Sequence, residues 1–132
     1  MTLADLRDYF KIEFPWAESC TVGKADMNKE IAVCFYNSRV PRPKITAFGG
    51  KKNLGSAIKP VTILLRYGKN ASEAEQKASE IFNFFDEKTF FINGKRVFTI
   101  SPNNSPIDLG TDERGIYEYS FEFDFYEERK DE

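Results

Sequence analysis

The side chains that could do chemistry in this sequence are carboxylates and cations, because the chain has no histidine and only two cysteines. Histidine is the usual general acid–base group near neutral pH and the commonest ligand of transition metals. The sequence also lacks a phosphate-binding glycine loop and a nucleophile elbow. We therefore expect no catalytic residue, no metal and no cofactor, and a small enzyme or ligand-binding domain is the less favoured alternative.

Three carboxylates lie close together in the turn-rich stretch SPNNSPIDLGTDERG, namely Asp108, Asp112 and Glu113. Together they could attract a divalent ion. Their spacing matches no calcium-binding loop, however, and loop carboxylates more commonly cap turns. We expect these three residues to cap turns.

Cations are concentrated in the segment 38–60, which contains no acid. Its three prolines, three glycines and lack of periodicity predict a long basic loop or arm. The cations are Arg39, Arg42, Lys44, Lys51, Lys52 and Lys59. We expect them to contact a neighbouring subunit or another acidic surface. The alternatives are a solvated excursion and a nucleic-acid-binding module, although only Phe48 could stack on bases there.

Acids are concentrated near the other end of the sequence, where aromatic and polar residues alternate from Ile116 to Tyr126. Successive side chains of a strand point to opposite faces, so the alternation predicts a strand with an aromatic and an acidic face. The rings are Tyr117, Tyr119, Phe121, Phe123 and Phe125, and the acids are Glu118, Glu122 and Asp124. The acidic row could line an assembly lumen, meet a cationic partner or form an ordinary wet face.

Two helices are predicted to cover the aromatic face. Thr2 and Asp5 form a capping-box pattern for the first helix, which should end before Pro15. Asn70 and Glu73 have the same spacing at the start of the second. The apolar stripes are Leu3, Leu6 and Phe10 in the first helix, and Ala71, Ala74, Ala78, Ile81, Phe82 and Phe85 in the second.

Further strands should complete the sheet, and one pair of them contains both cysteines. The runs 19–23 and 31–36 predict a hairpin, in which a turn near Met27 would place Cys20 opposite Cys34. A disulfide is one reading of that pair, and a reducing compartment favours two small buried thiols instead. The run 61–67 predicts another strand, and Asn93-Gly94 predicts a type I′ turn between two more.

The chain of 132 residues has the length of one domain. Its order of elements predicts an α+β fold with a mainly antiparallel mixed sheet, covered on one face by two helices, and a long basic loop. The charged tail 127–132 should fray into solvent. No apolar run approaches the roughly 18 residues of a membrane helix. The first residues carry acids where a signal peptide carries cations, so we expect a protein that stays inside the cell.

The second half of the chain resembles a known family. From Lys59 to Tyr126 the succession KPVTILLRYG, a capped helix, FINGKRVFTI and SPIDLGTDERGIYEYSFEFDFY is similar to the minor capsid or tail-terminator proteins of long-tailed bacteriophages and of prophages of Gram-positive bacteria. The turn PIDLGTDERG running into YEYSF carries most of the likeness.

This resemblance implies a structural protein of the virion, assembled in the bacterial cytoplasm, with no catalytic residues. It implies a closed ring, usually a hexamer, on the end of the tail tube, where the ring stops tube growth and presents the surface that joins the head. The implied partners are further copies of the chain, the tail-tube protein and a head-connector protein. DNA would pass through the lumen without specific binding, and no membrane is involved.

Overall fold

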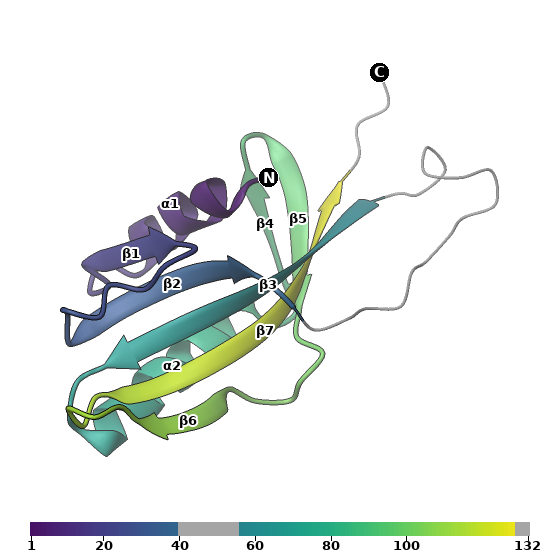
Figure 1. Ribbon diagram of the computed structural model, residues 1–132. Helices are drawn as coiled ribbons and strands as arrows, with labels where there is room; N and C mark the ends of the chain where they lie inside the picture. The colour runs from purple at the N-terminus through teal and green to yellow at the C-terminus, as the bar shows by residue number, and fades with distance from the viewer. Residues whose placement is uncertain (40–55, 129–132) are drawn as a thin grey trace.

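The structure is a computed structural model that describes residues 1–39 and 56–128 (Figure 1). In these ranges two helices pack on one face of a seven-stranded, mostly antiparallel sheet, which confirms the predicted α+β class. The elements are α1 (Leu3–Glu13), β1 (Ser19–Val22), β2 (Ile31–Asn37), β3 (Ser56–Tyr67), α2 (Ala71–Phe85), β4 (Lys88–Ile92), β5 (Lys95–Ile100), β6 (Ile107–Thr111) and β7 (Tyr117–Glu128).

Strand β7, the predicted aromatic strand, lies in the middle of the sheet. The strand order is β1-β2-β3-β7-β5-β4, and β6 also pairs with β7. On one side β7 pairs with β3 along almost its whole length. On the other side it pairs first with β6 and then with β5. Ser101 lies between these two partners, where its hydroxyl donates to the carbonyl oxygen of Glu122 at 2.8 Å.

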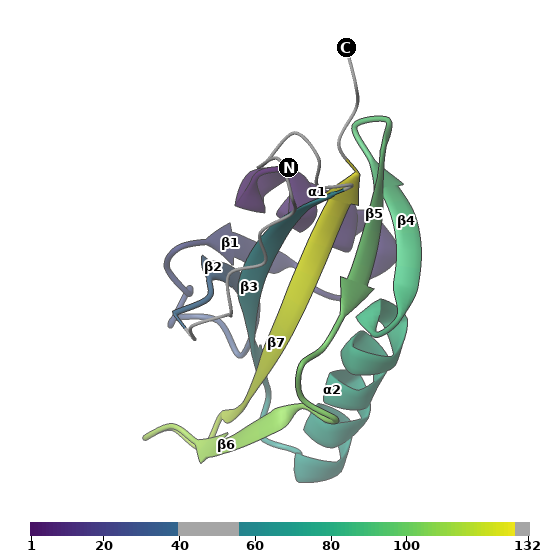
Figure 2. The same cartoon turned by 90° about the vertical axis from the view of Figure 1, so that its right-hand side faces the viewer.

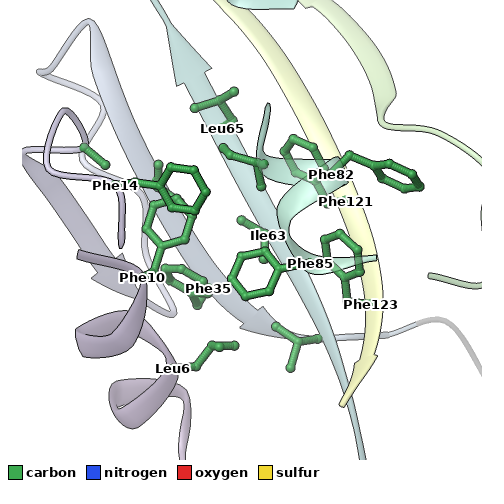
Figure 3. Close-up of a cluster of buried hydrophobic side chains, with 14 of the residues drawn as sticks. Leu6, Phe10, Phe14, Phe35, Ile63, Leu65, Phe82, Phe85, Phe121 and Phe123 are labelled. Atoms are coloured by element: carbon green, nitrogen blue, oxygen red, sulfur yellow. The ribbon is translucent and has the colours of Figure 1, made fainter. Parts of the chain in front are cut away.

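The aromatic side of β7 faces the helices and forms the core, as predicted (Figure 3). Phe121, Phe123 and Phe125 are buried, and so are the alternate residues Val61, Ile63 and Leu65 of β3. Phe85 of α2 packs against this layer, with its ring centroid 5.5 Å from that of Phe123. Phe10 of α1 lies 5.3 Å from Phe35 of β2, so both helices share one core with the sheet.

Both helices begin at the predicted caps. The Thr2 hydroxyl accepts a hydrogen bond from the Asp5 amide, and the Asp5 carboxylate accepts one from the Thr2 amide. Helix α1 ends at Glu13, before Pro15. The side-chain oxygen of Asn70 accepts from the Glu73 amide at the start of α2. Of the predicted stripe of α2, the first alanine is exposed and the other five residues are buried.

The predicted hairpin of β1 and β2 is wrong, because these two strands are parallel. Cys20 is paired with Val33, and Cys34 with Thr21. Paired residues of neighbouring strands share a face, so Cys20 lies on the helix side with Val33, while Cys34 lies on the other side. The two cysteines are free, and with side chains on opposite faces they cannot form the disulfide that a hairpin would have allowed.

The Asn-Gly turn is confirmed. Asn93 and Gly94 have φ values of 54° and 76°, the two positive angles that a type I′ turn requires, and they join β4 to β5. The positive angles explain why Asn, which tolerates this backbone region, and Gly, which has no side chain, occupy these positions.

Three further differences concern the predicted loops. Strand β3 begins at Ser56, so residues 56–60 of the predicted basic loop are strand instead. Residues 40–55, with Arg42, Lys44, Lys51 and Lys52, lie outside the described residues, as does 129–132. Strand β6 lies within the stretch predicted as a turn-rich connection. Glu127 was expected in a frayed tail, but its carboxylate is 2.6 Å from the N-terminal amine and 3.2 Å from Lys95.

Candidate functional site

The face of the sheet that carries no helix is the candidate interaction surface, and we call it the open face. In Figure 1 helix α2 lies behind β3 and β7, so the viewer looks onto this face. The acidic row of β7 lies here, paired in register with β3. Glu118 is opposite Arg66, Glu122 is opposite Thr62 and Asp124 is opposite Pro60.

At one end of the open face, Arg66 forms ion pairs with two carboxylates. Its guanidinium is 2.8 Å from Glu118 and 2.8 Å from Asp112, and the arginine side chain is fully buried. Burial lowers the pKa of Arg66, but the hydrogen bonds to Asp112 and Glu118 outweigh it and raise the pKa overall. The arginine therefore remains charged and ties β3 to β7 and to the turn that precedes β7.

That turn is organised by Asp112. Its Oδ1 accepts hydrogen bonds from the amides of Arg114 at 2.8 Å and Ile116 at 3.0 Å, while Oδ2 faces Arg66. The backbone hydrogen bond from Ile116, followed by the side-chain bond from Arg66, lowers the pKa of Asp112 to about 2. Arg114 in turn donates to the carbonyl oxygen of Met27, so the turn contacts the connection between β1 and β2.

The middle of the acidic row is largely covered. Glu122 is only 7% exposed, and its carboxylate accepts hydrogen bonds from the hydroxyl groups of Ser38, at 2.8 Å, and Thr62. Asp124 is 9% exposed. The alternation had predicted an acidic face in contact with water or a partner. Within the described residues Glu122 lies under the hydroxyl groups of Ser38 and Thr62, and Glu118 faces Arg66.

Two of the predicted cations lie in the described ranges, and the structure separates them. Arg39 is exposed and lines an open recess of about 630 Å³ together with Tyr36, Thr62 and Glu122. This recess brings one predicted cation near one predicted acid. Lys59 is paired with Phe125, so it lies on the helix side of the sheet and not on the open face.

Two of the three loop carboxylates, Asp108 and Asp112, cap turns as expected. Asp108 accepts from the Gly110 amide at 2.8 Å, and Asp112 makes the bonds described above. Within residues 1–39 and 56–128 no group of three or more potential metal ligands occurs. None of the described helices is long and apolar enough to cross a membrane.

Two features of the site were not predicted. Arg66 stands in the apolar run VTILLRY, but alternation along that run places it on the same face as Thr62, away from Val61 and Leu65. This parity was the available signal for its position on the open face. Strand β6 was missed because its five-residue alternation, IDLGT, lies within a stretch rich in turn-forming residues.

The described residues form a small α+β fold with an open sheet face and unpaired strand edges. The family model of the bacteriophage tail terminator protein matches residues 27–126. The chain therefore belongs to the bacteriophage tail terminator family. It is accordingly a structural protein of the phage tail and a component of the virion, which acts by contact with other tail and head proteins.

Comparison with individual proteins adds information on the fold alone. No curated protein matches the chain. A solved structure aligns with a TM-score of 0.58 at 15% sequence identity, covering 100% of this chain and 99% of its own. At this identity the likeness shows a shared architecture over the whole length.

Proposed function

We propose that this protein closes into a ring, a hexamer, on the end of the completed tail tube, stops tube growth and provides the surface that joins the head. The observation that carries the proposal is the family match over residues 27–126. Its partners are further copies of itself, the tail-tube protein and a head-connector protein. The protein works by occupying a position and performs no chemistry.

A ring requires a heterologous contact, in which one patch of each subunit meets a different patch of the next. If the rotation between subunits does not close, the same contact produces an open filament that keeps growing. Closure therefore distinguishes a terminator from the tube that it caps. The closed ring offers one surface to the tube end and a different surface to the head.

Phage particles made without this protein should have tails of uncontrolled length, or tails that are not joined to filled heads. Electron microscopy of a deletion mutant measures both, and supplying the gene in trans is the control that should restore joined tails. Joined tails of uniform length in the deletion mutant would contradict the proposed function.

We propose that the open face lines the lumen through which DNA passes. Glu118, Glu122 and Asp124 all belong to this face, and no described helix covers it. Fixed negative charge along a channel repels phosphate groups, so DNA would pass without being held. Because Glu122 and Asp124 are largely covered, their effect on DNA would be exerted through the field of the lumen and not through contact.

We also propose that the cations of segment 38–60 contact an acidic surface of the adjacent subunit. Six cations without an acid repel one another, and an acidic neighbour would remove that cost.

Charge reversal at both Lys51 and Lys52 should weaken assembly at low salt without lowering the melting temperature. Light scattering across a salt series measures this, with Lys11→Glu/Lys69→Glu as a control of equal charge change. Normal assembly of the Lys51/Lys52 variant at every salt concentration would exclude the segment from the interface.

A further inference from the structure

Strands β1 and β6 form two opposite edges of the sheet. Among the described strands, β1 pairs only with β2, and β6 pairs only with β7. Figure 1 shows them on either side of the three strands β2, β3 and β7, and Figure 2 shows β6 at the margin of the sheet. Each edge leaves a row of backbone N–H and C=O groups that another strand can pair with.

The two edges lie at the same level of the sheet. Register carries directly across all five strands, from Thr21 through Cys34, Leu64 and Ser120 to Ile107. The next row runs from Cys20 through Val33, Leu65 and Tyr119 to Asp108. If the same register continued across a junction between the β6 edge of one subunit and the β1 edge of the next, the contact would repeat without a large rise, as a closed ring requires.

The two edges carry few of the features that protect a free strand: β6 has one charged residue, Asp108, and a register irregularity, and β1 has neither. Edges are commonly blocked by Lys or Pro, and the sequences SCTV and IDLGT contain neither. Both strands expose apolar side chains instead. Val22 is 36% exposed, Ile107 41% and Leu109 51%.

The third free edge, β4, fits this role less well. It begins with Lys88, and its Phe90 ring stacks on Tyr9 of α1 at 4.6 Å. At its level the opposite margin of the sheet is β3 itself, because β2 ends at Asn37, which pairs with Val61. No separate edge strand is available there as a counterpart in the described chain.

We propose that β6 of one subunit pairs with β1 of the next copy. The five strands β1, β2, β3, β7 and β6 of each subunit would then join into one continuous sheet around the ring. This inference rests on the proposed ring. Within one subunit β6 and β1 run in opposite directions, because one parallel and three antiparallel pairings separate them. Pairing of β6 with β1 of the next copy is therefore antiparallel.

A lysine placed on either edge tests the contact. Val22→Lys and Leu109→Lys should each reduce the assembled wild-type protein to single subunits, measured by light scattering over a range of concentrations. Phe91→Lys in β4 is the matched control, since Phe91 is 64% exposed on the edge that we exclude, and it should assemble normally. Unchanged circular dichroism and melting temperature confirm that each variant is folded.

Mixing the two variants tests the unlike pairing directly. Val22→Lys keeps an intact β6 edge and Leu109→Lys keeps an intact β1 edge, so an equimolar mixture should form heterodimers and no ring. Rings of wild-type mass from either variant alone would overturn this contact and leave the ring itself standing. A wild-type protein that never assembles, alone or on tube ends, would overturn the ring and this contact with it.

Discussion

Replacing Phe123 by alanine is expected to lower the free energy of unfolding by about 3–5 kcal/mol. The Phe123 ring is fully buried at the centre of the sheet, 5.8 Å from Phe82 and 5.5 Å from Phe85 of α2. Truncation removes apolar area from the core and leaves a cavity that rigid neighbouring strands cannot fill. The loss is a large part of the roughly 5–15 kcal/mol that stabilises a domain. Urea denaturation monitored by circular dichroism measures it.

Phe91→Ala is the control for the Phe123 variant, because the same atoms are removed from a side chain that is 64% exposed. We expect the control to cost less than about 1 kcal/mol. Glu122→Gln is a second comparison on the opposite face, and it should also cost less than Phe123→Ala because no cavity forms. Equal losses of stability at Phe123 and Glu122 would show that the core has been assigned to the wrong face of β7.

Replacing Arg66 by methionine should cost about 3 kcal/mol, the lower end of the range for removing one partner of a buried ion pair. The arginine is fully buried, whereas the side chains of Asp112 and Glu118 keep 16% and 19% exposure. Water can therefore partly solvate these two carboxylates once the arginine is removed, which lowers the cost. Lys69→Met is the control, since Lys69 is exposed and its amine lies 3.9 Å from the Glu30 carboxylate, a long and solvated ion pair. Equal stability of the two variants would mean that the Arg66 ion pairs do not stabilise the fold.

The pH dependence of stability provides an independent measurement on the same residues. The folded protein holds the pKa of Asp112 near 2, below the ordinary value of 3.8. A lowered carboxylate pKa stabilises the fold fully above pH 3.8, and this contribution is lost as the pH falls towards 2. The stability difference between wild type and Arg66→Met should therefore shrink between pH 4 and pH 2. A difference that stays constant over this interval would contradict the assignment.

The parts of the fold that could be predicted are those with a local cause. The alternation in β7 specified its faces, the caps at Thr2 and Asn70 specified the helix starts, and Asn93-Gly94 specified a turn. In each case the deciding interaction joins residues a few positions apart. The expectation that both helices cover the aromatic face of β7 followed from these local patterns.

What could not be predicted depends on contacts between distant segments. Alternation indicates faces but not strand direction, so the parallel arrangement of β1 and β2 gave no sign in the sequence. The run IDLGT of β6 alternates apolar and polar residues, but it is short, all five of its residues are exposed, and among the described strands it pairs with β7 alone. The cover over Glu122 comes from Ser38 and Thr62, which lie 84 and 60 positions away.

The central place of β7 also sets the time at which the subunit can fold during synthesis. Its main partner β3 is complete at Tyr67, and β7 is complete 61 residues later at Glu128. At translation rates of about 5–20 residues per second, β3 waits roughly 3–12 s for its neighbour. Throughout that interval the edge of β3 that later pairs with β7 has no partner strand. Nascent chains of this protein should therefore be clients of ribosome-associated chaperones, and a ring can only be assembled from chains whose last strand has already emerged.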